Sequence, residues 1–204
     1  MTLSTPLLWV ILPLIIAILC GIFINRLMFS MVLSSLSALG LALLAAFFPE
    51  NLLIAIGPIT LNFTENLGFL GRQITIRYEI LPFITLLYAM TALWMLSSTL
   101  PGVPKIFPPI GMTITALLTA ALGVRPFLYA ALLIETAVLV SVPLLSTMED
   151  ETRPGILRYL TLQTMAMPFI LLAGWLLTGV ETLPPDSPLV NQTTIILGLG
   201  FALL

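Results

Sequence analysis

The sequence contains no histidine and a single cysteine, Cys20. Zinc, haem and iron–sulfur centres of the usual kinds take their protein ligands largely from these two residue types. We therefore expect these 204 residues to hold no metal and no cofactor.

Charge is equally scarce, since charged residues make up 8% of the chain and the net charge is −2. A soluble domain carries about 25% charged residues. The low charge and the apolar share of 59% indicate a membrane protein. The negative balance argues against nucleic acid as a partner, and the sequence shows no basic cluster that would suggest a lipid-headgroup site.

Long apolar runs recur along the whole chain. A run of about 20 residues is needed to cross a hydrocarbon core about 30 Å thick. We predict an all-α polytopic membrane protein with about seven transmembrane helices: two in 1–48, an extramembrane connector over 49–79, and helices three to seven over 80–204, the last incomplete. The expected segments are 6–24, 28–48, 80–100, 106–123, 126–146, 156–178 and one from about 190.

The connector over 49–79 has a different pattern. Apolar and polar residues alternate in QITIRYEI (73–80), and PITLNF (58–63) is similar. The turn-rich TENLGFLGR (64–72) separates the two stretches, so we predict one β-hairpin outside the membrane. Such a hairpin would either clamp a neighbouring subunit or simply cover helix ends.

Basic residues in the short loops predict the orientation of the chain. If the helices alternate in direction, the side with more basic residues faces inward, and the N-terminus and the hairpin lie outside. The inward group would be Arg26, Lys105, Arg153 and Arg158, and the outward group Arg72, Arg77 and Arg125.

Glu135 is the strongest signal for function, because it lies at the centre of the apolar stretch YAALLIETAVLVSV (129–142). An acidic residue at the middle of a membrane helix costs about 2.5–3.5 kcal/mol on insertion scales, and such carboxylates usually mark ion paths or relays. We predict that Glu135 relays protons. The alternative is a carboxyl group that is permanently protonated or locked in a structural ion pair.

A cationic partner for Glu135 is not evident in the sequence. Arg158 begins the sixth segment, and counting residues from the same membrane face separates the two backbones by about 14 Å in depth. We retain Arg158 as a possible site residue, but a long interfacial side chain that reaches toward water is the simpler interpretation.

Other polar residues lie inside the apolar segments. Thr115 and Thr119 are spaced i, i+4 in the fourth segment, and Thr161, Gln163 and Thr164 cluster in the sixth. They are candidates for a polar path through the membrane. Alternatively, they hydrogen-bond to backbone groups or pack between helices.

Taken together, these features resemble a known family. The long connector after two helices, the glutamate helix, RYLTLQTMAMPFILLAGWLLTG (158–179) and ILGLGFALL (196–204) are similar to the antiporter-like membrane subunits of complex I. Subunits of multisubunit Na⁺/H⁺ antiporters and membrane-bound hydrogenases belong to the same family. The resemblance covers essentially the whole chain and assigns Glu135 the proton-relay role, acting with a lysine on a broken seventh helix.

The sequence departs from the family at its end. The lysine would fall at Leu204 or just beyond it. Subunits of this family have about fourteen helices, including a second, inverted five-helix unit, and that unit is absent from this sequence. The chain therefore looks like the N-terminal half of such a subunit.

The resemblance implies a membrane subunit of a proton-translocating NADH:quinone oxidoreductase, a translocase with no redox site in this chain. Quinone, NADH, flavin and iron–sulfur clusters would bind only to partner subunits. Other membrane subunits and the lipid bilayer are the expected partners, in a multi-pass protein of a prokaryotic inner membrane with its N-terminus outside. The alternatives are a Na⁺/H⁺ antiporter subunit and a non-conducting membrane scaffold.

Overall fold

A computed structural model describes residues 2–47, 53–56, 59–64, 66–69, 72–97, 103–126, 128–146, 153–180 and 188–203. This part of the chain is mostly helical. Its seven α-helices are α1 (Thr5–Ile22), α2 (Leu27–Ala46), α3 (Leu81–Ser97), α4 (Phe107–Gly123), α5 (Leu128–Ser146), α6 (Arg153–Val180) and α7 (Pro188–Leu203).

Each helix coincides with one predicted apolar segment, and their ends differ by only a few residues. Three stretches are long and apolar enough to cross a membrane: Leu27–Ala46, Tyr78–Ser97 and Gly155–Leu176. Leu8–Ile22, Phe107–Gly123 and Leu128–Leu144 are apolar but shorter. Length and composition thus support a membrane protein, whereas seven spans remain a prediction.

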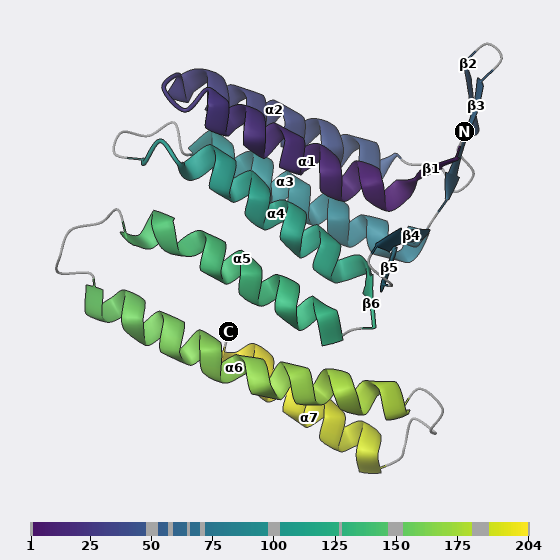
Figure 1. Ribbon diagram of the computed structural model, residues 1–204, viewed down its shortest axis with the longest axis vertical. Helices are drawn as coiled ribbons and strands as arrows, with labels where there is room; N and C mark the ends of the chain where they lie inside the picture. The colour runs from purple at the N-terminus through teal and green to yellow at the C-terminus, as the bar shows by residue number, and fades with distance from the viewer. Residues whose placement is uncertain are drawn as a thin grey trace.

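The helices run back and forth along roughly one direction, so that successive helices are antiparallel (Figure 1). α1 to α4 form one group, α5 lies along α4, and α6 lies along α5 on its other side. α7 packs mainly against α6. α5 therefore separates the four-helix group from the α6–α7 pair.

The main core lies within α1–α4. Trp9, Ile84, Tyr88, Met95 and Met112 are all completely buried there. By contrast, many leucines, isoleucines and phenylalanines on the outer faces are exposed. An apolar surface of this extent is unusual for a monomer in water but matches a lipid environment.

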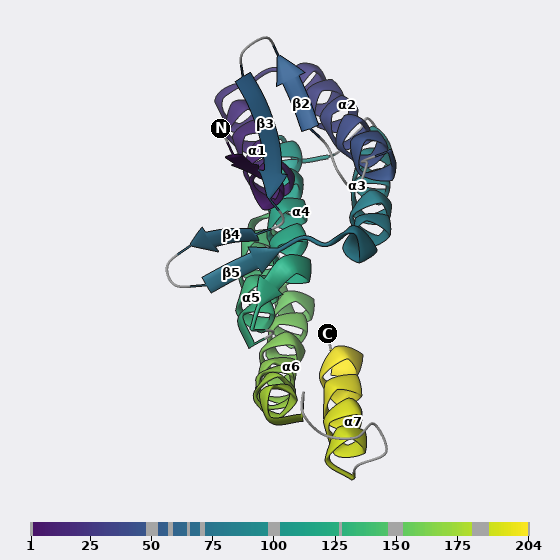
Figure 2. The same ribbon diagram turned by 90° about the vertical axis from the view of Figure 1, so that its right-hand side faces the viewer.

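Short strands gather at one end of the helices, beside the N-terminus (Figure 2). Strands β2 (Leu53–Ile56) and β3 (Ile59–Thr64) form one hairpin, which β1 (Thr2–Ser4) extends in parallel with β3. Strands β4 (Asn66–Phe69) and β5 (Arg72–Thr75) form a second hairpin, which β6 (Val124–Arg125) extends.

The connector thus contains β-structure as predicted, but the predicted pairing is wrong. Within the stretch 58–63, residues 59–62 pair with Leu53–Ile56 rather than with 73–80, and Pro58 lies outside the described residues. The second alternating stretch ends as a strand at Thr75 and is followed by a 3₁₀ turn, Tyr78–Ile80. Two hairpins form in the connector because β2 pairs with β3 and β4 with β5, each across a shorter loop than the single predicted hairpin would need.

The two predicted groups of basic residues lie at opposite ends of the helices. Arg26 and Lys105 lie in the turns that precede α2 and α4, and Arg158 lies in the first turns of α6. Arg72, Arg77 and Arg125 lie at the other end, on or beside the second sheet.

Candidate functional site

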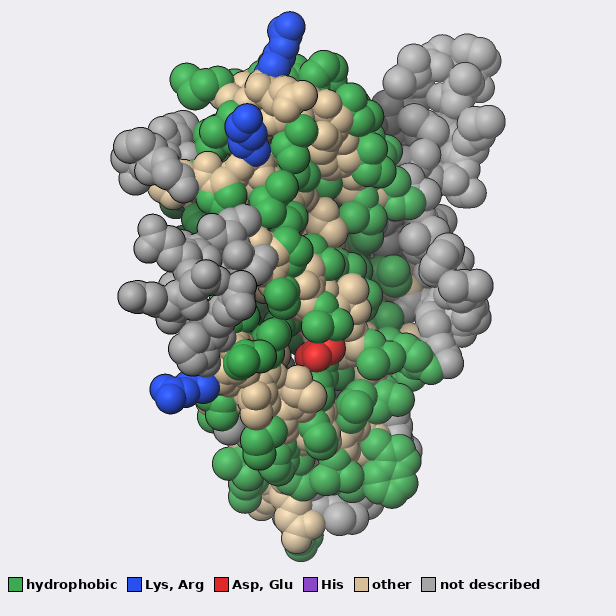
Figure 3. Space-filling view, turned by 60° about the vertical axis from the view of Figure 1, so that its left-hand side comes forward, with side chains coloured by type: hydrophobic (Ala, Val, Ile, Leu, Met, Phe, Trp, Pro, Cys, Tyr) green, Lys and Arg blue, Asp and Glu red, His purple; other side chains and the backbone are tan. Residues whose placement is uncertain are grey.

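Glu135 lies near the middle of α5. Leucine and alanine, which are strong helix formers, precede it, and the helix continues through Pro143 to Ser146. Its Oε2 atom is buried and has no hydrogen-bond partner among the residues that the structure describes. An acidic side chain is visible amid hydrophobic groups on the face drawn in Figure 3.

The packing of α5 on α6 gives the level of Glu135 in the fold. Ala131, one turn before Glu135, shares a small core with Met167 and Ile170 of α6. Because the two helices are antiparallel, one turn further along α5 corresponds to one turn earlier along α6. Glu135 is therefore level with residues 163–166, a stretch that includes the buried Gln163 and Ala166.

Gln163 is the buried path candidate that the fold brings to the level of Glu135. Its side chain is only 3% exposed, although both neighbouring positions on α6 are exposed. An amide can donate to a carboxylate or accept from a protonated carboxyl. A glutamine amide can therefore hydrogen-bond to either protonation state of a carboxyl group.

Arg158 does not lie beside Glu135. It is exposed, and it lies five to eight residues before the stretch level with Glu135, which is about 8–12 Å along the helix axis. This offset is somewhat smaller than the 14 Å expected from the sequence. It still leaves the guanidinium on the surface near the loop end, as expected for an interfacial arginine.

Thr115 and Thr119 belong to a different part of the protein. Thr115 Oγ1 lies 3.0 Å from Thr91 Oγ1 on α3, and Thr119 Oγ1 lies 3.4 Å from the Tyr88 hydroxyl. That hydroxyl donates to the carbonyl oxygen of Trp9 on α1 at 2.5 Å. These residues form a buried polar chain that links α1, α3 and α4.

The polar chain is not connected to Glu135 by any hydrogen bond between described residues. Thr115 and Thr119 also donate to the carbonyls of Gly111 and Thr115, one turn earlier in α4. Their hydroxyls are thus satisfied within the helix group, which favours the packing interpretation of these two threonines over the path.

The remaining polar residues of α6 face outward. Thr161 and Thr164 are exposed, and each donates to its own helix, to the carbonyls of Leu157 and Leu160. Of the polar cluster predicted in α6, only Gln163 is buried.

α7 contacts the same helix close to this level. A Cβ on Gly200 would lie 2.7 Å from Ile170 Cγ1 and 3.3 Å from its backbone nitrogen, so the two backbones approach closely. Thr193, two turns earlier in α7, is also buried. α6 therefore contacts α5 and α7 near Ile170.

Tyr88 is a buried polar residue that the sequence analysis missed. A tyrosine in the middle of an apolar segment was a usable signal, because a buried phenol normally finds a hydrogen-bond partner. What the sequence could not show is that the partner is the backbone of α1, 79 positions away.

The described residues contain no group of three or more histidine, cysteine or acidic side chains that could hold a metal ion. Comparisons of the chain with protein-family models, with curated proteins and with solved structures find no match. The functional argument therefore rests on the chemistry of Glu135 and its surroundings.

Proposed function

We propose that the chain is a multi-pass subunit that relays protons across a membrane through Glu135. In this proposal it belongs to the membrane arm of a proton-translocating NADH:quinone oxidoreductase, and its N-terminus and strands face outside. Electron transfer would take place in partner subunits and drive the relay indirectly.

The buried Glu135 Oε2 atom carries this proposal. A carboxyl oxygen that is removed from water without a hydrogen bond lowers the stability of the fold by about 1–3 kcal/mol. A leucine at this position would avoid that cost, so a role in ion movement is the simplest reason for a glutamate. Gln163, buried at the same level, offers a group that can hydrogen-bond to either protonation state.

The direction of α7 supports the same interpretation. Gly200 lies against Ile170, and α7 runs antiparallel to α6. Residues that continued this helix beyond Leu203 would therefore reach the level of residues 163–166, and so of Glu135. This is where the lysine implied by the family resemblance would be needed.

The test is a Glu135→Gln variant in the assembled complex, with proton uptake into inverted vesicles measured against NADH oxidation. Glutamine keeps the size of the side chain but cannot release a proton. If this subunit is the only pumping unit, we expect the ratio of protons translocated to electrons transferred to fall at least fivefold. If other subunits also pump, we expect the ratio to fall by the fraction of pumping that this subunit contributes. Glu79→Gln is the matched control, because Glu79 is exposed beside the strands. An unchanged ratio in an intact Glu135→Gln complex would refute the relay.

The same vesicles separate the two alternatives. Proton flux that follows a Na⁺ gradient without NADH would identify a Na⁺/H⁺ antiporter subunit. Unchanged flux in Glu135→Gln, combined with loss of assembly when β2–β3 or β4–β5 is altered, would identify a scaffold.

A further inference from the structure

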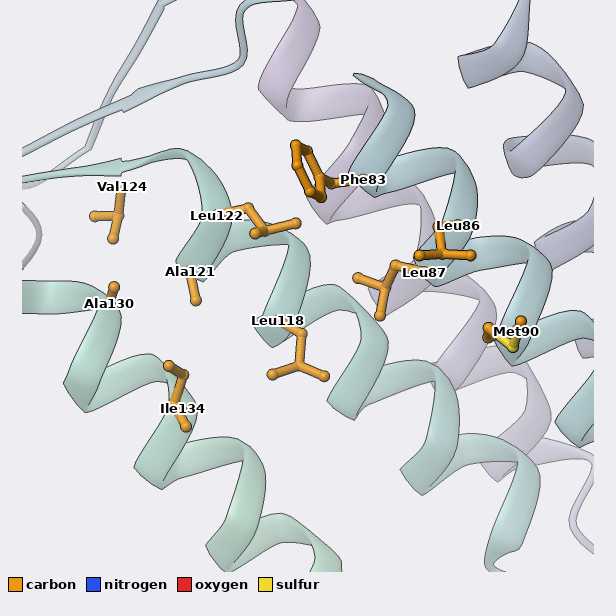
Figure 4. Close-up of a pocket in the computed structure, with 10 residues that line it drawn as sticks. All are labelled: Phe83, Leu86, Leu87, Met90, Leu118, Ala121, Leu122, Val124, Ala130 and Ile134. Carbon is orange, nitrogen blue, oxygen red and sulfur yellow. The ribbon is translucent and has the colours of Figure 1, made fainter. Parts of the chain in front are cut away.

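An apolar groove of about 540 Å³ lies between α3, α4 and α5. Figure 4 shows its ten lining side chains, all of which are apolar. Ala130 and Val124 are buried, whereas Phe83, Leu86 and Met90 are exposed. The groove is therefore open along the outer surface of the helices.

The depth of the groove matches one leaflet of a bilayer. Its lining extends from Phe83 to Met90 on α3 and from Leu118 on α4 to Val124 just after it, which is about 10 Å along the helix axes. One leaflet contributes about 15 Å of a hydrocarbon core about 30 Å thick. A transmembrane helix of a partner would need a contact surface running across both leaflets, and this groove does not provide one.

One end of the groove is basic. Val124, at that end, is followed directly by the exposed Arg125 in β6. β6 pairs with β5, whose first residue is Arg72, and the exposed Arg77 follows shortly after β5. Only one described acidic residue, Glu79, lies close in sequence to these arginines. The exposed Arg125 therefore places a positive charge at this end of the groove.

These two features fit a single ligand. We infer that the groove holds one acyl chain of a phospholipid, whose phosphate is bound at Arg125. The apolar lining excludes water from the chain, and arginine forms paired hydrogen bonds with phosphate oxygens. This inference is independent of the proton-relay proposal, since none of these residues belongs to the Glu135 site.

Native mass spectrometry of the purified protein, after exposure to phosphatidylglycerol in a neutral detergent, tests the site. We expect one firmly held phospholipid on the wild-type chain. Ala121→Phe would fill the groove and reduce the bound fraction at least fivefold. Gly40→Phe adds the same bulk to an exposed position with open space around it, and we expect it to bind as the wild type does.

Arg125→Gln tests the headgroup contact without altering the groove, and we expect a severalfold loss of bound phospholipid. Equal binding by wild type and Ala121→Phe would overturn the site, and equal binding by Arg125→Gln would overturn its headgroup contact. A photoreactive amino acid at the exposed rim residue Leu122 identifies the occupant in native membranes. A lipid adduct supports the inference, whereas a cross-link to a polypeptide means that a partner protein fills the groove.

Discussion

The first four helices bury Trp9, Tyr88, Met95 and Met112 completely, whereas the described core shared by α5 and α6 consists of Ala131, Met167 and Ile170. The four-helix group also satisfies its buried hydroxyls with hydrogen bonds, while Glu135 on α5 keeps a buried oxygen without one. The first region is built for stability. The second carries a destabilising polar group on a thin core, as functional sites often do.

The largest stability effect should come from the centre of the four-helix group. Tyr88→Ala removes a fully buried ring and its bond to α1, so we expect a loss of about 3–5 kcal/mol in the free energy of unfolding. Thermal unfolding in detergent, followed by circular dichroism, measures it. Tyr159→Ala on the exposed face of α6 is the control and should change the midpoint little. Similar losses for both variants would contradict the contrast between the two regions.

The contact between α6 and α7 should be the next most sensitive feature. Gly200→Val would press a branched side chain against Ile170, and we expect overpacking to cost about 1–3 kcal/mol. Gly198→Val is the control, because Gly198 lies in the same helix with open space around its Cβ position. Any loss of stability in this variant therefore reports the change in helix propensity alone. Cross-linking of cysteines placed on α6 and α7 should weaken only in the Gly200 variant. Weakening in both would mean that helix propensity, rather than the close approach, is responsible.

At Glu135 we predict a gain in stability rather than a loss. Glu135→Met replaces a poorly bonded carboxyl with an apolar side chain of similar length, so we expect the protein to become more stable by about 1–2 kcal/mol. The unfolding midpoint in detergent should rise. A fall would show that the carboxyl has a stabilising partner and would remove the main argument for a functional role.

The smallest effect is expected at the polar chain. Thr115→Val removes the contact with Thr91 but keeps the shape of the side chain. Hydrogen bonds between membrane helices average about 0.6 kcal/mol, and we expect a loss of that size. Thr113→Val, whose hydroxyl bonds only to its own helix at Pro109, is the matched control. A loss much larger than in the control would mean that the polar chain acts as a cooperative unit.

The positions of the helices along the chain could be predicted from the sequence. Which face of each helix packs against its neighbours could not. Apolar runs of 16 residues or more, separated by proline, glycine and charge, are enough to locate α1 to α7. These helices are apolar on nearly every side, so no polar stripe reveals which face is buried. For this reason Thr115 and Gln163 looked equivalent in the sequence, yet one bonds to α3 and the other lies level with Glu135.

The pairing of the strands also could not be predicted from the sequence. β1 and β6 are three and two residues long, too short to show any alternation. β1 directly precedes α1 and β6 directly follows α4, so the packing of these helices decides which strands β1 and β6 meet. For the same reason the sequence did not show that Arg125 lies beside Gln73, since only the pairing of β5 with β6 brings these two residues together.

The pairing of β5 with β6 also sets the order in which parts of the fold can form while the chain is being synthesised. β5 is made before α3, but β6 emerges only after α4, so the second sheet closes when the fourth helix has left the ribosome. Chains fold from the N-terminus as they are made. The four-helix group can therefore be finished before Glu135 is made, and α5 would then pack against the existing surface of α4. In the multi-pass subunit that we propose, the carboxyl of Glu135 would enter the bilayer beside a finished helix group rather than on an isolated helix.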